Sequence, residues 1–96
     1  MKGSAMKLKP EVIRSLERET RLSEAAVARL EEQCRAFETK YGWSTEEFLR
    51  KFDAGEIGDD QDYFVWYALA RAKQDWQATR QSLNEVLTGA QTLGDV

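Results

Sequence analysis

The sequence predicts an all-α protein, built as a helical hairpin plus a long C-terminal helix in a bundle-like, oligomeric arrangement. Apolar side chains recur at spacings of three and four over residues 23–41, which places them on one face of a helix. Neither glycine nor proline occurs between Asp60 and Gly89, so a single helix can extend through that stretch. With 96 residues, 42% of them hydrophobic and 32% charged, the chain has the composition of one globular domain.

The N-terminal segment is expected to form an arm and then a short, polar helix. Residues 1–9 are assigned to the arm, and residues 1–6 read like a linker followed by a second start methionine, as an expression tag would leave. Pro10 suits the first turn of a helix, because the N–H that it lacks would be unpaired there in any case. A first helix is therefore predicted over residues 10–20.

A second helix is predicted to start at Ser23, a residue type that favours the N-cap position. Leu22 before it is placed to pack on Val27, as in a hydrophobic staple. Gly42 can end the helix in the left-handed conformation. Five apolar residues share its inner face: Val27, Leu30, Cys34, Phe37 and Tyr41.

A third, short helix follows and completes a compact aromatic hairpin around residues 24–54. Ser44 and Glu47 match the S-x-x-E capping box, with Trp43 and Phe48 placed as its staple. Glycines at 55 and 58 then bracket a turn. The second and third helices are expected to fold back on each other.

The fourth helix is predicted from about residue 60 to 88, with Asp59 as its N-cap. At 1.5 Å per residue it would be roughly 40 Å long. Residues 89–96 show no helical pattern and are expected to form a flexible tail. Residues 10–88 are thus assigned to a single helical domain.

Several kinds of chemistry find no support in the residues. The chain has no histidine and its only cysteine is Cys34, which sits in an apolar stripe where a free cysteine behaves as a small hydrophobe. The acidic segment 53–62 does not place oxygen ligands at calcium-loop spacing. No nucleophile stands beside a base. We therefore expect no metal, no cofactor and no catalytic residue, and a protein that is not an enzyme.

Charge is unevenly distributed along the chain. Residues 1–22 carry six basic and three acidic side chains, whereas residues 23–61 carry five basic and ten acidic ones. Lys9, Arg14 and Arg18 are candidates for contact with anions such as DNA phosphates, although the chain has no DNA-binding motif. No stretch is apolar enough to span a membrane or to form a signal-peptide core. A cytoplasmic location is expected.

The aromatic run Tyr63–Tyr67 surrounds the whole circumference of the fourth helix, since five consecutive residues turn through about 500°. Tyr63, Trp66 and Tyr67 share a broad face that can line a core, which leaves Phe64 for another surface. Either the other helices cover both sides, or the run forms part of a protein interface, where such side chains are enriched. The candidate interface residues are Asp59, Asp60, Phe64, Trp66 and Tyr67.

Residues 36–69 resemble a segment of small bacterial and archaeal proteins that are encoded as the antitoxin half of toxin–antitoxin pairs. The segment covers about a third of the chain. The matching pieces are Phe37, Tyr41-Gly42, Ser44, Glu47-Phe48, Phe52, the Gly55 turn, Asp59-Asp60 and Phe64-Trp66-Tyr67.

The resemblance implies an antitoxin that neutralises a partner toxin, a small RNA-directed enzyme, by covering its basic active surface. An acidic centre would speed association with such a surface, and the basic arm would add operator contacts. The alternative is a structural protein without a toxin partner. In that case the helices associate only with their own copies, as a symmetric homodimer or tetrameric bundle.

Overall fold

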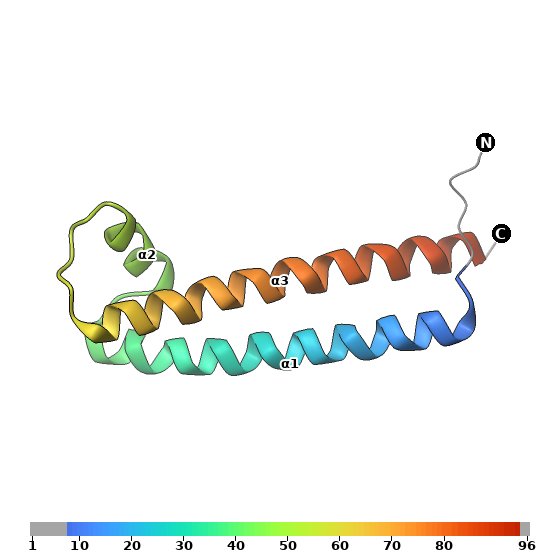
Figure 1. The fold of residues 1–96 in the computed structure, drawn as a ribbon, viewed down its shortest axis with the longest axis horizontal. Coiled ribbons are helices and arrows are strands. Elements are labelled where there is room, and N and C mark those ends of the chain that lie inside the picture. The colour runs from blue at the N-terminus through green and yellow to red at the C-terminus, as the bar shows by residue number, and fades with distance from the viewer. Residues whose placement is uncertain (1–7, 95–96) are drawn as a thin grey trace.

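The computed structural model describes residues 8–94, a range that holds three helices and no strand. These are α1 (Pro10–Tyr41), α2 (Thr45–Asp53) and α3 (Gln61–Gly94). The predicted all-α class is confirmed, as is the layout of a helical hairpin followed by a long C-terminal helix. In Figure 1, α1 and α3 lie side by side as an antiparallel pair, and α2 closes the turn at one end. We call residues 42–60 the cap and the opposite end of the helix pair the far end.

The first two predicted helices are in fact one continuous helix, so the predicted boundary at Ser23 is wrong. The Ser23 hydroxyl donates a hydrogen bond to the carbonyl of Glu19 at 2.9 Å, and the Thr20 hydroxyl donates to that of Leu16 at 2.9 Å. Each hydroxyl is therefore satisfied inside a helix that continues past it, instead of capping a new one. Neither glycine nor proline interrupts residues 11–41. Leu22, expected to staple the new helix, is 53% exposed.

The two ends of α1 agree with the signals in the sequence. Pro10 occupies the first turn, after Lys9 in an extended conformation. Gly42 has a φ of 75° and donates its N–H to the carbonyl of Glu38 at 2.8 Å. A positive φ is costly for residues with a Cβ atom, so glycine at this position ends α1 and directs the chain into α2.

The start of α2 is fixed by Ser44, the predicted N-cap residue. The Ser44 hydroxyl accepts a hydrogen bond from the backbone N–H of Glu47 at 3.0 Å. This bond satisfies one of the N–H groups that have no partner within the helix.

Replacing Ser44 by alanine is expected to lower the free energy of unfolding by about 1 kcal/mol, because that N–H loses its acceptor. Urea unfolding followed by circular dichroism measures the change. Ser82→Ala is the matched control, since Ser82 is an exposed residue inside α3 where alanine is the better helix former. Equal stability of the Ser44→Ala variant and the unmodified chain would show that the bond contributes nothing.

The long helix α3 differs from its predicted bounds at both ends. Its N-cap residue is Asp60, not Asp59, because the Asp60 side chain accepts a hydrogen bond from the backbone N–H of Asp62 at 2.8 Å. The helix continues through Gly89 to Gly94, so the backbone of residues 89–94 is helical where a flexible tail was expected. Helix bonds already formed on both sides outweigh the preference of one glycine for other conformations. Residues 1–7 of the predicted arm and residues 95–96 lie outside the described residues.

The core lies at the cap end, where α1, α2 and the first turns of α3 meet. Its fully buried members are Cys34 of α1, Phe48 of α2 and Trp66 of α3, exposed by 1%, 0% and 0%. Partly buried side chains surround them: Phe37, Tyr41, Trp43, Leu49, Phe52, Ile57, Tyr63, Tyr67 and Leu69. We call this set the cap cluster.

Beyond the cap cluster, the contact between α1 and α3 mixes small, polar and apolar side chains, with Val27 buried in it. The inner face of α1 carries the small residues Thr20 and Ser23, both buried. Facing positions of α3 include the half-buried Lys73 and Arg80, with buried Leu87 further on. Inner positions on both helices recur at alternating spacings of three and four, the pattern of a coiled-coil seam. None of the helices among residues 8–94 is both long and apolar enough to cross a membrane.

Candidate partner-binding surface

Trp66 lies in the centre of the cap cluster and is not part of the surface. Its ring stacks on that of Phe48, with centroids 4.0 Å apart and planes 4° from parallel. Its indole N–H donates to the hydroxyl of Thr45 at 3.1 Å. Since Trp66 is 0% exposed, it cannot touch a partner while the fold is intact, and we remove it from the candidate interface.

Thr45 joins all three helices through a short chain of hydrogen bonds. Besides accepting from Trp66, its hydroxyl donates to Oε2 of Glu38 at 2.7 Å, and its backbone N–H donates to the same oxygen at 2.8 Å. Glu38 thus satisfies a free N–H at the start of α2. Thr45 is itself 2% exposed, and an interior site strengthens such bonds.

Phe64 is the predicted interface residue that the fold presents to solvent, being 53% exposed. Its ring is held in place by packing edge-on against the ring of Phe52, with the two ring centroids 6.0 Å apart. Phe52 in turn stacks on half-buried Tyr67 at 4.3 Å. Beside Phe64, Val65 is 44% exposed. The expectation that Phe64 would lie outside the core is confirmed, and its ring is an exposed aromatic group at the cap end.

The predicted acidic residues lie in the loop that leads into α3. Asp59 and Asp60 are both exposed, and Asp60 also caps the helix. Residues 42–62 carry seven acidic and only two basic side chains, so the cap end has a negative potential that attracts basic surfaces. The structure therefore brings Asp59, Asp60 and Phe64 to one end of the molecule, next to partly buried Tyr67.

Asp62, at the edge of this acidic region, is already engaged within the chain. Its Oδ2 accepts from Nζ of Lys40 at 2.6 Å and from the hydroxyl of Tyr41 at 2.8 Å. The bond from Lys40, followed by that from Tyr41, lowers the pKa of Asp62. The bond to Asp62 raises the pKa of both donors. Asp62 therefore helps to tie α3 to the end of α1, and we do not count it as a contact for a partner.

The predicted anion-contacting residues lie elsewhere. Lys9, Arg14 and Arg18 are exposed. Lys9 directly precedes α1, and the two arginines belong to its first three turns, which lie at the far end in Figure 1. Arg14 and Arg18 are one turn apart and share a face with Arg21. A long helix pair separates them from the acidic cap, so they lie outside the candidate partner-binding surface.

Cys34 is a core residue, as predicted. It is 1% exposed, and burial raises the pKa of its thiol. A raised pKa lowers the thiolate fraction and hence the reactivity of the sulfur. Among the described residues, no group of three or more cysteine, aspartate or glutamate side chains is arranged to hold a metal ion.

The two long sides of the helix pair differ in polarity, most clearly along α3. On one side α3 presents a stripe with alternating spacings of four and three, consisting mainly of apolar residues: Val65, Leu69, Ala72, Trp76, Leu83 and Val86. From α1 the same side receives Leu22 and Ala26, and these meet Trp76 around a groove of 360 Å³. We call this the apolar side. Trp76 is 39% exposed and Val86 48% exposed.

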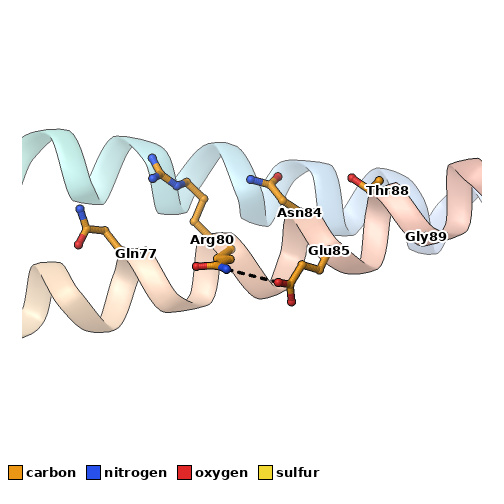
Figure 2. A pocket seen from close by; sticks show the side chains of 7 residues that line it. Gln77, Arg80, Asn84, Glu85, Thr88 and Gly89 are labelled. Atoms are coloured by element: carbon orange, nitrogen blue, oxygen red, sulfur yellow. Dashed lines mark hydrogen bonds between the residues drawn. The ribbon is translucent and has the colours of Figure 1, made fainter.

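The opposite side, which we call the polar side, is hydrophilic along both helices. On α3 it includes a groove of 850 Å³ whose lining is Gln77, Arg80, Gln81, Asn84, Glu85, Thr88 and Gly89. Figure 2 shows Gln77, Arg80 and Asn84 pointing from α3 toward α1, with a hydrogen bond from Gln81 to Glu85 of 3.4 Å. On α1 this side carries charged residues such as Glu31 and Arg35.

Trp76, Leu83 and Val86 were absent from the predicted site. In the sequence they read as one helix face with Leu87, diluted by Lys73 and Arg80. The structure separates them: Leu87 is 8% exposed and faces α1, whereas the other three belong to the apolar side. The recurrence of apolar residues from Val65 to Val86 at coiled-coil spacing is the signal that could have revealed this side.

No protein-family model, curated protein or solved structure matches the chain.

Proposed function

We propose that the chain is a protein-binding module whose cap end docks a small protein with a basic surface. In line with the resemblance of residues 36–69, we propose further that this partner is an RNA-directed toxin and that binding neutralises it. The observation that carries the proposal is Phe64: a large aromatic ring, 53% exposed, that packs against Phe52 at the same end of the molecule as the exposed Asp59 and Asp60.

The features of the cap end suit such a complex. Its negative potential would steer a basic protein toward it and raise the rate of association. Aromatic rings held in place by packing lose little conformational entropy on binding, which makes them effective anchors. RNA-binding surfaces are basic because they contact phosphates, so an acidic cap fits them and would exclude the RNA.

The test begins with capture of the partner from native extract, followed by its expression alone and together with this chain. Growth arrest by the partner alone, relieved by co-expression, supports the toxin assignment. A partner that binds but leaves growth unchanged retains the binding proposal and refutes the antitoxin.

Two substitutions test the surface. Phe64→Ala and Asp59→Lys are each expected to weaken the complex about tenfold or more, a loss of about 1.4 kcal/mol, as measured by calorimetry with the purified partner. Asp60 is left unchanged because it also caps α3. The control is Glu32→Lys, an equal charge reversal at an exposed position in the middle of α1. Full affinity in both cap variants would exclude the cap end as the docking site.

A further inference from the structure

Nothing among residues 8–94 covers the apolar side of the helix pair. Two helices share one seam, and that seam buries only one face of each. The stripe from Val65 to Val86 keeps a coiled-coil spacing, which is the pattern of a helix that packs against a further helix of similar pitch. On the equivalent positions of the polar side, α3 carries residues such as Gln74, Gln81 and Glu85. Only one side is therefore built for burial.

The molecule also exposes more surface than its mass requires. Its accessible area is 6713 Å², whereas a compact monomer of 11.0 kDa has about 5,600 Å². The elongated shape of the helix pair contributes to this difference of about 1,100 Å², which leaves room for an uncovered side of the size that each partner contributes to a standard interface, roughly 800 Å². The radius of gyration, 18.4 Å, likewise exceeds the value of about 13 Å for a compact domain of 100 residues.

The occupant that fits this side is a second copy of the chain, because the side is self-complementary under a two-fold rotation. Glu19 and Arg29 lie on the α1 part of the apolar side, one on each side of Leu22 and Ala26. A two-fold axis that crosses α1 near Glu24 places Glu19 opposite Arg29 of the second copy, and Arg29 opposite the second copy's Glu19. Both charges of each chain are then paired.

The same axis also fits the α3 part. The stacking of Phe37 on Trp66 sets the register of the antiparallel pair, and in this register Glu24 lies level with residues 79–80. Rotation about that point places Trp76 opposite Leu83 of the second copy. Trp76 then lies near the centre of the interface, the position that hot-spot residues favour.

We propose that two copies associate through their apolar sides into an antiparallel four-helix bundle, with α1 against α1 and α3 against α3. Each chain then gains the second seam that its apolar stripe requires. The polar sides and the cap ends remain outside, so the dimer is compatible with partner docking at the cap but does not depend on it. Three features of the molecule favour this dimer: the stripe, the exposed area and the Glu19–Arg29 complementarity.

The unmodified protein is the first sample to test, by sedimentation equilibrium over a range of concentrations. We expect a mass of twice 11.0 kDa. A mass of 11.0 kDa throughout would overturn the proposal.

Two adjacent exposed residues of α3 provide a matched pair of variants that spares the core. Thr79 belongs to the apolar side, and Ala78 lies at the mirror-image position on the polar side. Thr79→Glu is expected to weaken the dimer about tenfold or more, since it buries a charge in the interface of both chains. Ala78→Glu is expected to leave it intact. Circular dichroism checks that both variants remain helical, and equal dimer affinity for the two would overturn the assignment of the side.

The charge pairing tests the direction of the second copy. Glu19→Arg and Arg29→Glu each bring like charges together and are expected to dissociate more readily than the unmodified dimer. The Glu19→Arg variant is basic at positions 19 and 29, and the Arg29→Glu variant is acidic at both. When the two are mixed, every pair across the interface is again of opposite charge, so a heterodimer should form. Native mass spectrometry distinguishes the species, and absence of a heterodimer preference would overturn the antiparallel arrangement.

Discussion

Replacement of Trp66 by alanine is expected to destabilise the fold by about 3–5 kcal/mol, the range for removing a large aromatic side chain from a core. The loss has two physical parts. The stacked contact with Phe48 at 4.0 Å disappears, and a cavity remains where α1, α2 and α3 meet. Because isolated domains are stable by only about 5–15 kcal/mol, the variant should be partly unfolded at 37 °C.

Urea unfolding at one fixed protein concentration measures this change, since association shifts apparent stability. Phe64→Ala is the informative comparison, because Phe64 lies two residues away on the same helix and is 53% exposed. We expect Phe64→Ala to cost less than about 1 kcal/mol of stability while it weakens partner binding. A Trp66→Ala variant as stable as Phe64→Ala would contradict the placement of Trp66 at the centre of the core.

Replacement of Thr45 by valine is expected to cost about 2–3 kcal/mol, although the two side chains have nearly the same shape. Valine leaves the indole N–H of Trp66 without an acceptor in a buried site, and an unsatisfied buried donor costs about 1–3 kcal/mol. It also removes the hydroxyl that donates to Glu38, a bond strengthened by the charge of its acceptor.

The control for this prediction is Thr45→Ser, which keeps the hydroxyl and removes only a methyl group. It should lose about 1 kcal/mol, so the order of stability is expected to be threonine, serine, valine. Urea midpoints measured under identical conditions give that order directly. If valine proved as stable as serine, the hydrogen-bond chain from Trp66 to Glu38 would make no net contribution to folding.

Sequence reasoning was most successful where a local hydrogen bond decides the structure. The end of α1 at Gly42 and the start of α2 at Ser44 depend on residues within a few positions of each other, so the local pattern contains the necessary information. The division of the aromatic run followed from helical periodicity in the same way, with Trp66 inside and Phe64 outside.

Ser23 shows why other features could not be predicted. Serine can cap a helix or bond back to the carbonyl four residues earlier, and both options are local. The choice was made by tertiary packing, because α3 lies against α1 at this level and Ser23 is 1% exposed. The apolar side of α3 escaped prediction for a related reason. The positions of α3 that face α1 and the positions of its apolar side differ by one residue, so the two stripes overlap in the sequence. Only the position of α1 shows which of the two stripes is buried within the chain.

The proposed site was predictable in part. Asp59, Asp60 and Phe64 were identified from charge and aromatic content, and the fold places them at one exposed end. Trp66 was included for the same reason, since tryptophan is frequent both in interfaces and in cores. Composition cannot separate these two roles. The separation needs the three-helix junction, which the sequence indicates only as several independent helices.

Aromatic packing is concentrated at one end of the helix pair, and this affects the order in which the two helices associate during folding. Residues near the cap that meet across the pair are close in sequence, as Phe37 and Trp66 are, whereas residues that meet toward the far end are separated by most of the chain. Closing the cap first costs the least chain entropy and shortens every loop that closes afterwards. The helices should thus join from the cap outward and fray from the far end inward, where small side chains and Leu87, not large aromatic rings, are buried between them. A protein that binds the cap would therefore contact the part of the molecule that unfolds last.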